Sequence, residues 1–396
     1  MKSNKIRLGE QCVVTSSKRF HLSERITQGV PFYCSKEIIK KFNGEDVTEC
    51  DYISEDLYKK VSNEFGVPKE NDLLITTRGT IGIPYLYKRT DRFYFADGNL
   101  TWIKDFDSNL YSKFLYYWFQ SYEGRKKFEA LAKGTAQKAV PISGIKTLEI
   151  ELPPLKNQKR IADILSAYDD LIENNQKQIK LLEEAAQRLY KEWFVDLHFP
   201  GHENTKIVDG VPEGWNEKTL SQVANVIMGQ SPKSEFYNSE KKGLPFHQGV
   251  GSYGVRFVMD DIYSTSYTRI AEPSSILFSV RAPVGRLNIT KNKVVIGRGL
   301  AAINQTDGCQ SYLYYLLKNK FFKDNIVGNG SIFASVSKDE LLNQKFLIPE
   351  RNLMMQFEKI VSQMDKQIEN LDSKNKKLIE ARDRLLPKLM SGEVEV

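Results

Sequence analysis

The chain has 396 residues and a formal net charge of +7 at pH 7, which predicts two or three domains and permits, without requiring, a polyanionic partner. It contains no run of 18 apolar residues and no apolar N-terminal segment, so the sequence predicts neither a transmembrane helix nor a signal peptide. The four scattered cysteines predict free thiols and exclude a disulfide framework or a cysteine-based zinc site.

The first part of the chain is predicted to be mixed α and β structure. Residues 72–90, "DLLITTRGTIGIPYLYKRT", carry glycine between two β-forming runs, which predicts two strands joined by a turn. Residues 112–132, "SKFLYYWFQSYEGRKKFEALA", predict helix. The proline pair at 153–154 then closes this region and precedes a long helical pattern.

The same order of elements recurs further along the chain. Residue n aligns with residue n+196 around the long helical pattern, so "LPPLKNQKRIADIL" at 152–165 matches "IPERNLMMQFEKIV" at 348–361. The chain is therefore predicted to be two diverged copies of one unit, each a mixed α/β region followed by a helix. Further matches pair "DLLITTRGTIG" at 72–82 with "SILFSVRAPVG" at 275–285, and "FLYYWF" at 114–119 with "YLYYLL" at 312–317.

The repeat divides the chain into four segments. Residues 190–215 contain Pro, Gly and polar residues without a period, which indicates a linker between the copies. The predicted segments are a first globular domain at 1–154, a central spacer helix at 155–198, a second globular domain at 199–350 and a C-terminal spacer helix at 351–396.

Both predicted helices carry an apolar seam that advances by alternating steps of four and three residues, the period of a coiled coil. Each helix is expected to run about 33 residues, or roughly 50 Å, and Pro387 is expected to end the second. The first seam comprises Ile161, Leu165, Tyr168, Ile172, Asn175, Ile179, Leu182, Ala186 and Leu189. The second comprises Phe357, Val361, Met364, Ile368, Leu371, Asn375, Leu378, Arg382 and Leu385.

Each seam holds one asparagine, Asn175 in the first and Asn375 in the second. A buried asparagine weakens a coiled coil but fixes its register. We therefore expect the two helices to pair with each other in antiparallel orientation. Two alternatives stay open, a coiled coil with another protein and an ordinary amphipathic core helix. Ile164, Leu171 and Ala185 form a second apolar line that could receive a partner helix.

The sequence predicts no catalytic or metal site. It has no GxxxxGK[ST] phosphate loop, and no glycine-rich loop followed by the N/D-P-P-Y/F tetrapeptide of amino-methyltransferases. His198 and His202 flank Pro200 and Gly201, which cannot lie in a helix, so their spacing does not predict a metal pair.

Two tandem domains joined by antiparallel helices would acquire a pseudo-two-fold relation within one chain. On duplex DNA such an arrangement reads two half-sites about one helical turn, ~34 Å, apart. Because the copies differ in sequence, the half-sites are expected to differ and to be separated by a fixed gap.

The candidate DNA-contacting residues lie at two turns of each copy. Arg reads guanine, Asn and Gln read adenine, and Lys, Ser and Thr bind phosphate, whereas the alternative for each residue is a hairpin turn with a surface charge. Glycine in these turns lets the backbone approach a strand closely. The first-copy candidates are Thr77, Arg78, Gly79, Thr80, Lys133, Gly134, Thr135, Gln137 and Lys138. The second-copy candidates are Ser279, Arg281, Asn329, Gly330, Ser331, Phe333 and Ser335, with Arg298, Arg256 and Arg269 as further ones.

Two segments resemble a known family. The stretch that opens "PPLKNQKRIA" at 153–162 and ends "EWFVDLHFPG" at 192–201 resembles the central conserved region of Type I restriction–modification specificity subunits. Residues 347–396 resemble the C-terminal conserved region of that family. The first copy has "SSKR" at 16–19 where the second has "GQSP" at 229–232, which is closer to the family pattern. The resemblance implies two target recognition domains that read a bipartite, asymmetric DNA site.

The resemblance also implies partners and a setting. It implies a non-catalytic DNA-recognition subunit in the prokaryotic cytoplasm, which directs adenine-N6 methylation and restriction of foreign DNA. The partners would be double-stranded DNA, two methyltransferase subunits and restriction/translocase subunits, with no membrane. No cofactor is expected on this chain, whereas the partners would use S-adenosylmethionine, ATP and Mg²⁺. The alternatives are a coiled-coil protein-binding adaptor and a stand-alone DNA-modifying enzyme.

Overall fold

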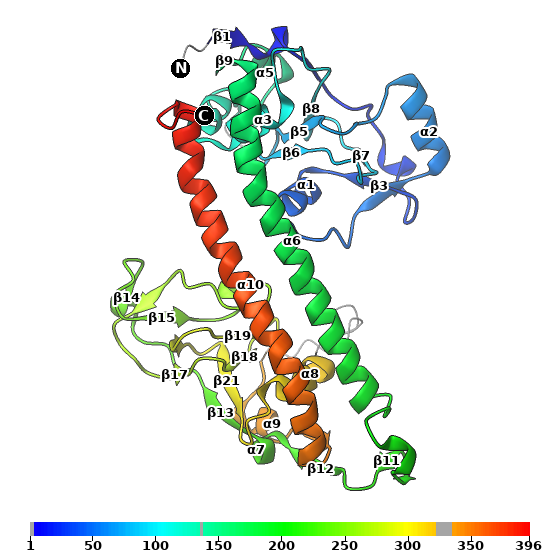
Figure 1. Ribbon diagram of the computed structural model, residues 1–396, viewed down its shortest axis with the longest axis vertical. Coiled ribbons are helices and arrows are strands. Elements are labelled where there is room, and N and C mark those ends of the chain that lie inside the picture. Colours follow the sequence, from blue (N-terminus) through cyan, green and yellow to red (C-terminus); the bar gives the residue numbers. More distant parts are fainter. Residues whose placement is uncertain (1–3, 135–137, 322–334) are drawn as a thin grey trace. The chain divides into compact units, whose positions relative to one another are not determined.

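The computed structural model describes residues 4–134, 138–321 and 335–396 (Figure 1). The chain forms two compact units, one of Met1–Lys177 with Asp372–Val396 and the other of Gln178–Leu371. Each of the two long helices therefore contributes one half to each unit. No helix in the described parts of the chain is both long and apolar enough to cross a membrane.

The described residues of the first unit form three small sheets and five short α-helices. The sheet orders are β2-β8-β5-β6, β4-β3-β7 and β1-β9. Its strands are β1 (Asn4–Arg7), β2 (Val13–Thr15), β3 (Val30–Tyr33), β4 (Asp51–Ile53), β5 (Leu73–Thr76), β6 (Pro84–Leu86), β7 (Tyr94–Phe95), β8 (Leu100–Lys104) and β9 (Glu149–Leu152). Its helices are α1 (Ser35–Phe42), α2 (Glu55–Glu64), α3 (Ser112–Gln120), α4 (Tyr122–Glu129) and α5 (Ile142–Lys146).

The second unit repeats this plan with more strands. The sheet orders are β13-β21-β18-β19, β14-β16-β15-β20-β17 and β12-β22, with a separate β10-β11 pair. Its strands are β10 (Ile207–Val208), β11 (Val211–Pro212), β12 (Asn216–Thr219), β13 (Ala224–Met228), β14 (Tyr237–Asn238), β15 (Leu244–His247), β16 (Tyr263–Ser264), β17 (Ile270–Ala271), β18 (Ile276–Ser279), β19 (Leu287–Ile289), β20 (Val294–Ile296), β21 (Leu300–Gln305) and β22 (Lys345–Ile348). Its short α-helices are α7 (Leu220–Val223), α8 (Gln310–Phe321) and α9 (Lys338–Leu342). Single 3₁₀ turns occur at Leu8–Glu10, Leu22–Glu24, His202–Asn204, Ser234–Phe236 and Val250–Ser252.

The two units share one strand topology, which confirms the predicted tandem repeat of mixed α/β copies. In each, a four-stranded antiparallel sheet has its N-terminal strand at one edge, and a parallel strand pair lies in another sheet, β3 with β7 and β15 with β20. The strand β5, "LLIT", is buried at all four positions because both its faces are covered. Leu73 and Ile75 pack in one hydrophobic cluster while Leu74 packs in another. The equivalent strand β18, "ILFS", is buried in the same way.

The two long helices are α6 (Leu155–Phe194) and α10 (Arg351–Ser391), of 40 and 41 residues, longer than the sequence pattern indicated. They pack against each other in antiparallel orientation, which confirms the predicted self-pairing (Figure 1). In the first unit, Asn175 Nδ2 donates to Asn375 Oδ1 at 2.7 Å, so the two seam asparagines satisfy each other. In the second unit, the rings of Tyr190 and Phe357 meet with centroids 6.0 Å apart.

The expectation that Pro387 ends the second helix is wrong, because α10 continues through it to Ser391. A proline inside a helix removes one backbone hydrogen bond and crowds the preceding turn. The side chains on either side, Leu386 and Leu389, are buried in the core of the first unit, and this packing holds the last turn in place. The helix ends instead before Gly392, whose φ of 75° is the left-handed conformation that glycine adopts readily.

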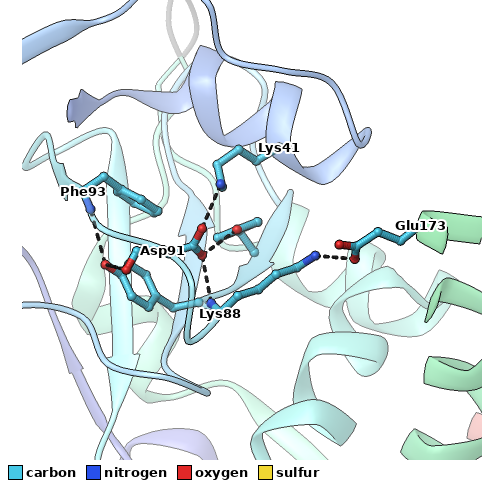
Figure 2. Close-up of polar contacts among 7 residues, drawn as sticks. Lys41, Lys88, Asp91, Phe93 and Glu173 are labelled. Atoms are coloured by element: carbon cyan, nitrogen blue, oxygen red, sulfur yellow. Dashed lines mark hydrogen bonds and ion pairs between the residues drawn. The ribbon is translucent and has the colours of Figure 1, made fainter. Parts of the chain in front are cut away.

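In the first unit, an exposed ion pair joins the mixed α/β region to α6. Asp91 accepts hydrogen bonds from Lys88 N at 2.8 Å and Tyr85 Oη at 2.6 Å, and pairs with Lys41 Nζ at 2.8 Å (Figure 2). These contacts fix the turn that follows β6. From this turn, Lys88 Nζ reaches Glu173 of α6 at 2.5 Å (Figure 2).

In the second unit, a buried cation makes the corresponding connection. The side chain of Arg256 is 2% exposed, and its guanidinium pairs with Glu183 of α6 at 3.2 Å and with Asp365 of α10. It also lies over the Tyr314 ring, 4.4 Å from the centroid, and donates to Tyr315 Oη at 3.2 Å. Burial raises the pKa of Asp365, and the charge of Arg256 opposes that rise. Arg256 therefore holds the second mixed region to both long helices.

Candidate nucleic-acid interface

The turns that follow the two buried central strands are built alike. After β5, Gly82 N donates to Thr76 O at 2.8 Å and Ile83 N donates to Thr76 Oγ1 at 2.9 Å. After β18, Gly285 N donates to Ser279 O at 3.0 Å, and Arg286 N donates to Ser279 Oγ at 2.8 Å. A hydroxyl at the end of each strand thus closes a tight turn.

Each turn presents one arginine to solvent. Arg78 and Arg281 occupy equivalent positions and both are exposed. Gly79, with a φ of 75°, lets the backbone turn sharply behind Arg78. These two cations are the strongest candidates for contact with a polyanion, because each lies on a loop whose backbone is fixed by hydrogen bonds.

The structure brings the two predicted groups of loop residues together in each copy. In the first, Arg78 forms a β-bridge with Ala139, and Val140 N donates to Thr77 O at 2.9 Å. In the second, Arg281 bridges Ser335, and Val336 N donates to Val280 O at 2.8 Å. The sequence did not predict this pairing, because the segments are more than 50 residues apart and no local pattern links them.

The predicted contact residues differ in accessibility. Thr77 and Ser279 are buried at 3% and 1% exposure, and the Ser279 hydroxyl accepts the hydrogen bond that closes its turn. The candidates that are exposed are Arg78, Gly79, Thr80, Lys133, Gly134, Lys138, Arg281, Arg298 and Ser335. Thr135, Gln137, Asn329, Gly330, Ser331 and Phe333 lie outside the described residues.

Two further arginines from the sequence prediction have different surroundings. Arg256 was a candidate for DNA contact, but its buried ion pairs with Glu183 and Asp365 make it a structural cation. Sequence alone could not distinguish these roles, because the two carboxylates come from distant helices. Arg269 is exposed on the surface of the second unit.

The carboxyl ends of several strands meet at the edge that carries these turns. In the second unit, Val280 N donates to Gly299 O and Gly229 N donates to Leu300 O, each at 2.9 Å. The loops after β13, β18 and β20 therefore converge beside Arg281. Sequence analysis missed Gln230, Ser231 and Gln248 at this edge, although the "GQSP" motif at 229–232 was a signal for two of them.

In the first unit, a cationic and aromatic hollow of about 430 Å³ lies along β2 and β8. Lys18 Nζ lies 4.8 Å from the centroid of the Phe65 ring, and Lys104 Nζ lies 4.3 Å from that of Trp102. Arg19 in the same hollow pairs with Asp97 at 2.7 Å. Phe65 is 49% exposed whereas Trp102 is buried at 3%, so the Lys18–Phe65 pair is the part of this hollow that suits contact with a sugar–phosphate backbone.

The histidines and cysteines form no metal site. The rings of His198 and His202 lie 5.5 Å apart, but each Nδ1 has another partner, Glu192 Oε1 at 3.0 Å and Phe199 O at 2.9 Å respectively. Among the described residues, no group of three His, Cys, Asp or Glu side chains could hold a metal ion. All four cysteines are free, and burial raises the pKa of the Cys12 thiol to about 12.

Comparison with known proteins agrees with this geometry. The family described as "Type I restriction modification DNA specificity domain" matches residues 3–184 and 212–381, one match in each copy. A Methanocaldococcus jannaschii protein provisionally named the type I restriction enzyme MjaX specificity subunit is 30% identical over 328 residues, covering 81% of this chain and 77% of its own length. The type I restriction enzyme MjaIX specificity subunit of the same organism is 28% identical, covering 72% of this chain and 69% of its own.

A solved structure shows the same fold. The crystal structure of a Type I restriction–modification system S subunit from M. genitalium superposes with a TM-score of 0.63. The alignment covers 98% of this chain and 96% of that one, at 19% sequence identity. At this identity the likeness supports the architecture, while the relatives above carry the family relationship.

Proposed function

Because this chain belongs to the family of Type I restriction–modification DNA specificity proteins, we propose that it selects the DNA site at which such a complex acts. The site is bipartite and asymmetric, with one short half-site for each copy and a fixed gap between them. The chain contributes recognition and no catalysis, and directs adenine methylation and restriction by its partners.

One observation carries this proposal. Both copies end their buried central strand in the same hydrogen-bonded turn, and each turn exposes one arginine, Arg78 or Arg281, paired with a second loop. Arg is the side chain that most often reads guanine in the major groove. The turns share their hydrogen bonds to Thr76 or Ser279 but differ in the residues around the arginine, "TTRGT" against "SVRAP", which suits two unlike half-sites.

The proposal includes partner subunits. Two methyltransferase subunits and restriction/translocase subunits would bind the protein and supply S-adenosylmethionine, ATP and Mg²⁺ chemistry in the prokaryotic cytoplasm. Leu171 and Leu181 on α6 are 51% and 64% exposed, and such apolar side chains on a helix suit docking of another protein.

The test is long-read methylome sequencing of a methylation-free host that produces this chain with its methyltransferase subunit. We expect one motif of two short, unlike base runs separated by a fixed gap, with adenine methylated on both strands. Arg78→Ala should weaken the base preference in only one of the two base runs, and Arg281→Ala in only the other. Each variant should lose roughly 1–3 kcal/mol of discrimination between the correct and a wrong base. Each variant is thus the matched control for the other.

Three outcomes would contradict the proposal. A soluble, associated pair of subunits that leaves no methylated motif would favour a protein-binding adaptor. Methyl transfer or nicking by the purified chain alone would favour a stand-alone enzyme. An unchanged motif in both arginine variants would remove these turns from the recognition surface.

A further inference from the structure

Three loops of the second unit meet around one hydroxyl. Ser231 Oγ donates to Gln248 Oε1 at 2.8 Å and accepts from Arg298 N at 3.2 Å. Ser231 lies beyond β13, Gln248 directly follows β15, and Arg298 lies between β20 and β21. A single serine thus ties together loops that are far apart in sequence, and its bond to Arg298 leaves its proton for the glutamine carbonyl.

Glycines make this close approach possible. A Cβ atom on Gly297 would lie 2.8 Å from Gln248 Oε1, and one on Gly299 would lie 2.5 Å from Gln248 O. A Cβ on Gly229 would lie 2.1 Å from Gly297 O. Any side chain at these three positions would push the loops apart, so the glycines hold Gln248 against the Gly297–Gly299 turn.

The polar groups that remain face outward. Gln248 and Arg298 are both exposed, and within the described ranges neither Gln248 Nε2 nor the Arg298 guanidinium has a hydrogen-bond or ion-pair partner. Beneath them, His247 is fully buried, with its Nδ1 2.9 Å from Ser252 Oγ. The Gln248 amide is thus held in place and the Arg298 guanidinium is unpaired among the described residues, and both lie next to the turn that carries Arg281.

We propose that Gln248 and Arg298 read two bases of the second half-site, and that Ser231 is a positioning residue for Gln248. Gln248 Nε2 can donate to adenine N7, while Oε1 keeps a second lone pair to accept from adenine N6. Arg298 can donate to guanine O6 and N7. The inference rests on the proposed function and adds the bases that this edge selects.

The first unit lacks this arrangement at the equivalent positions. Cys34 follows β3 where Gln248 follows β15, and Asp97 follows β7 where Arg298 follows β20. Asp97 pairs with Arg19, so the local charge is neutralised. The adenine and guanine contacts should therefore belong to the second half-site alone, and the first half-site serves as an internal control.

The test is methylome sequencing of the complex containing Gln248→Ala, Gln248→Glu, Ser231→Ala or Ser231→Thr. Gln248→Ala should relax one A·T position of the second half-site by roughly 5- to 150-fold. Gln248→Glu should shift that same position toward C·G, because a carboxylate accepts from cytosine N4. Ser231→Ala should relax the same position less than Gln248→Ala does, and Ser231→Thr, which keeps the hydroxyl, should retain the wild-type preference.

The outcomes separate this inference from the proposed function. A change at one position of the second run, with the first run intact, supports base reading by Gln248. An unchanged motif in both Gln248 variants overturns it, and so does a uniform loss of methylation with the wild-type base preference. Absence of any motif for the wild-type complex counts instead against the proposed function. The base switch with Gln248→Glu is a readout that a purely structural role would not produce.

Discussion

The two units neutralise equivalent carboxylates with different cations. Asp169 and Asp365 are equivalent in the repeat, as are Tyr117 and Tyr315. In the first unit, Tyr117 donates to Asp169 at 2.6 Å, and Arg382 of α10 pairs with it at 2.6 Å. In the second unit, the repeat places Ala186 where Arg382 would be, and Arg256 from the α/β region pairs with Asp365 instead.

This difference changes what each cation holds together. In the first unit Arg382 joins helix to helix, and an exposed ion pair, Lys88 with Glu173, reaches from the α/β region to α6. In the second unit Arg256 joins the α/β region to both helices at once. A buried ion pair is costly to break from one side, whereas an exposed one contributes little. The second recognition region should therefore be held more firmly than the first.

The largest expected effect is from Arg256→Met. It leaves the carboxylates of Glu183 and Asp365, with side chains 20% and 21% exposed, without their shared cation. We expect a loss of about 3 kcal/mol in the stability of the second unit. Hydrogen exchange measured by mass spectrometry should show faster exchange in residues 310–321 and 351–371, and no change in residues 112–132.

The matched control is a triple variant with Arg256→Met, Glu183→Gln and Asp365→Asn. It removes the unpaired charges together with the cation, so it should recover most of the lost protection. Equal exchange in the single variant and the wild type would show that the buried cation does not hold the second unit. A triple variant no better than the single one would assign the loss to packing of the Arg256 stem on the tyrosines.

Periodic and repeated features could be predicted from sequence, because they depend on local spacing. The seam positions and the antiparallel pairing follow from a 3.5-residue period with one asparagine in each helix, and Asn175 does bond Asn375. The role of Arg256 could not be predicted in this way. An arginine in a polar segment has the same sequence pattern whether it contacts DNA or pairs with two distant carboxylates.

The candidate site also contains residues that local sequence patterns predict and residues that only tertiary contacts bring together. Exposed Arg78 and Arg281 could be identified because a glycine-containing turn between two β-forming runs is a local signal. Ser231 and Gln248 could not, because their contact depends on three loops meeting over the glycines of the Gly297–Gly299 turn. Burial of Thr77 and Ser279 is likewise a result of tertiary packing, since both lie where a strand passes into its turn.

A middle-sized effect is expected from Arg382→Met in the first unit. Asp169 would lose its cation but keep the hydrogen bond from Tyr117, and both charged side chains are about a quarter exposed, at 23% and 27%. We expect the first unit to lose about 1.5 kcal/mol of stability. Hydrogen exchange should become faster in residues 155–177 and 372–391, and the second unit should be unaffected. Arg384→Met is the control, since Arg384 is 79% exposed and should change nothing. Equal losses in both variants would mean that the paired charge is not the cause.

The smallest effect is expected from Lys88→Met, which removes the exposed contact with Glu173. Glu173 keeps its ion pair with Lys177 at 2.9 Å. The opening free energy of residues 84–95, measured by hydrogen exchange, should therefore fall by no more than ~0.5 kcal/mol, and only at low ionic strength. Burial raises the pKa of Glu173, but the bonds from Lys88 and Lys177 lower it further, to below its ordinary value of 4.5. The contribution of the pair is therefore fully present above pH 4.5 and lost as the pH falls through the lowered pKa. The Lys88→Met variant could instead lose as much stability as Arg256→Met does, independently of salt. That result would contradict the prediction that the α/β region of the first unit is held less firmly than that of the second.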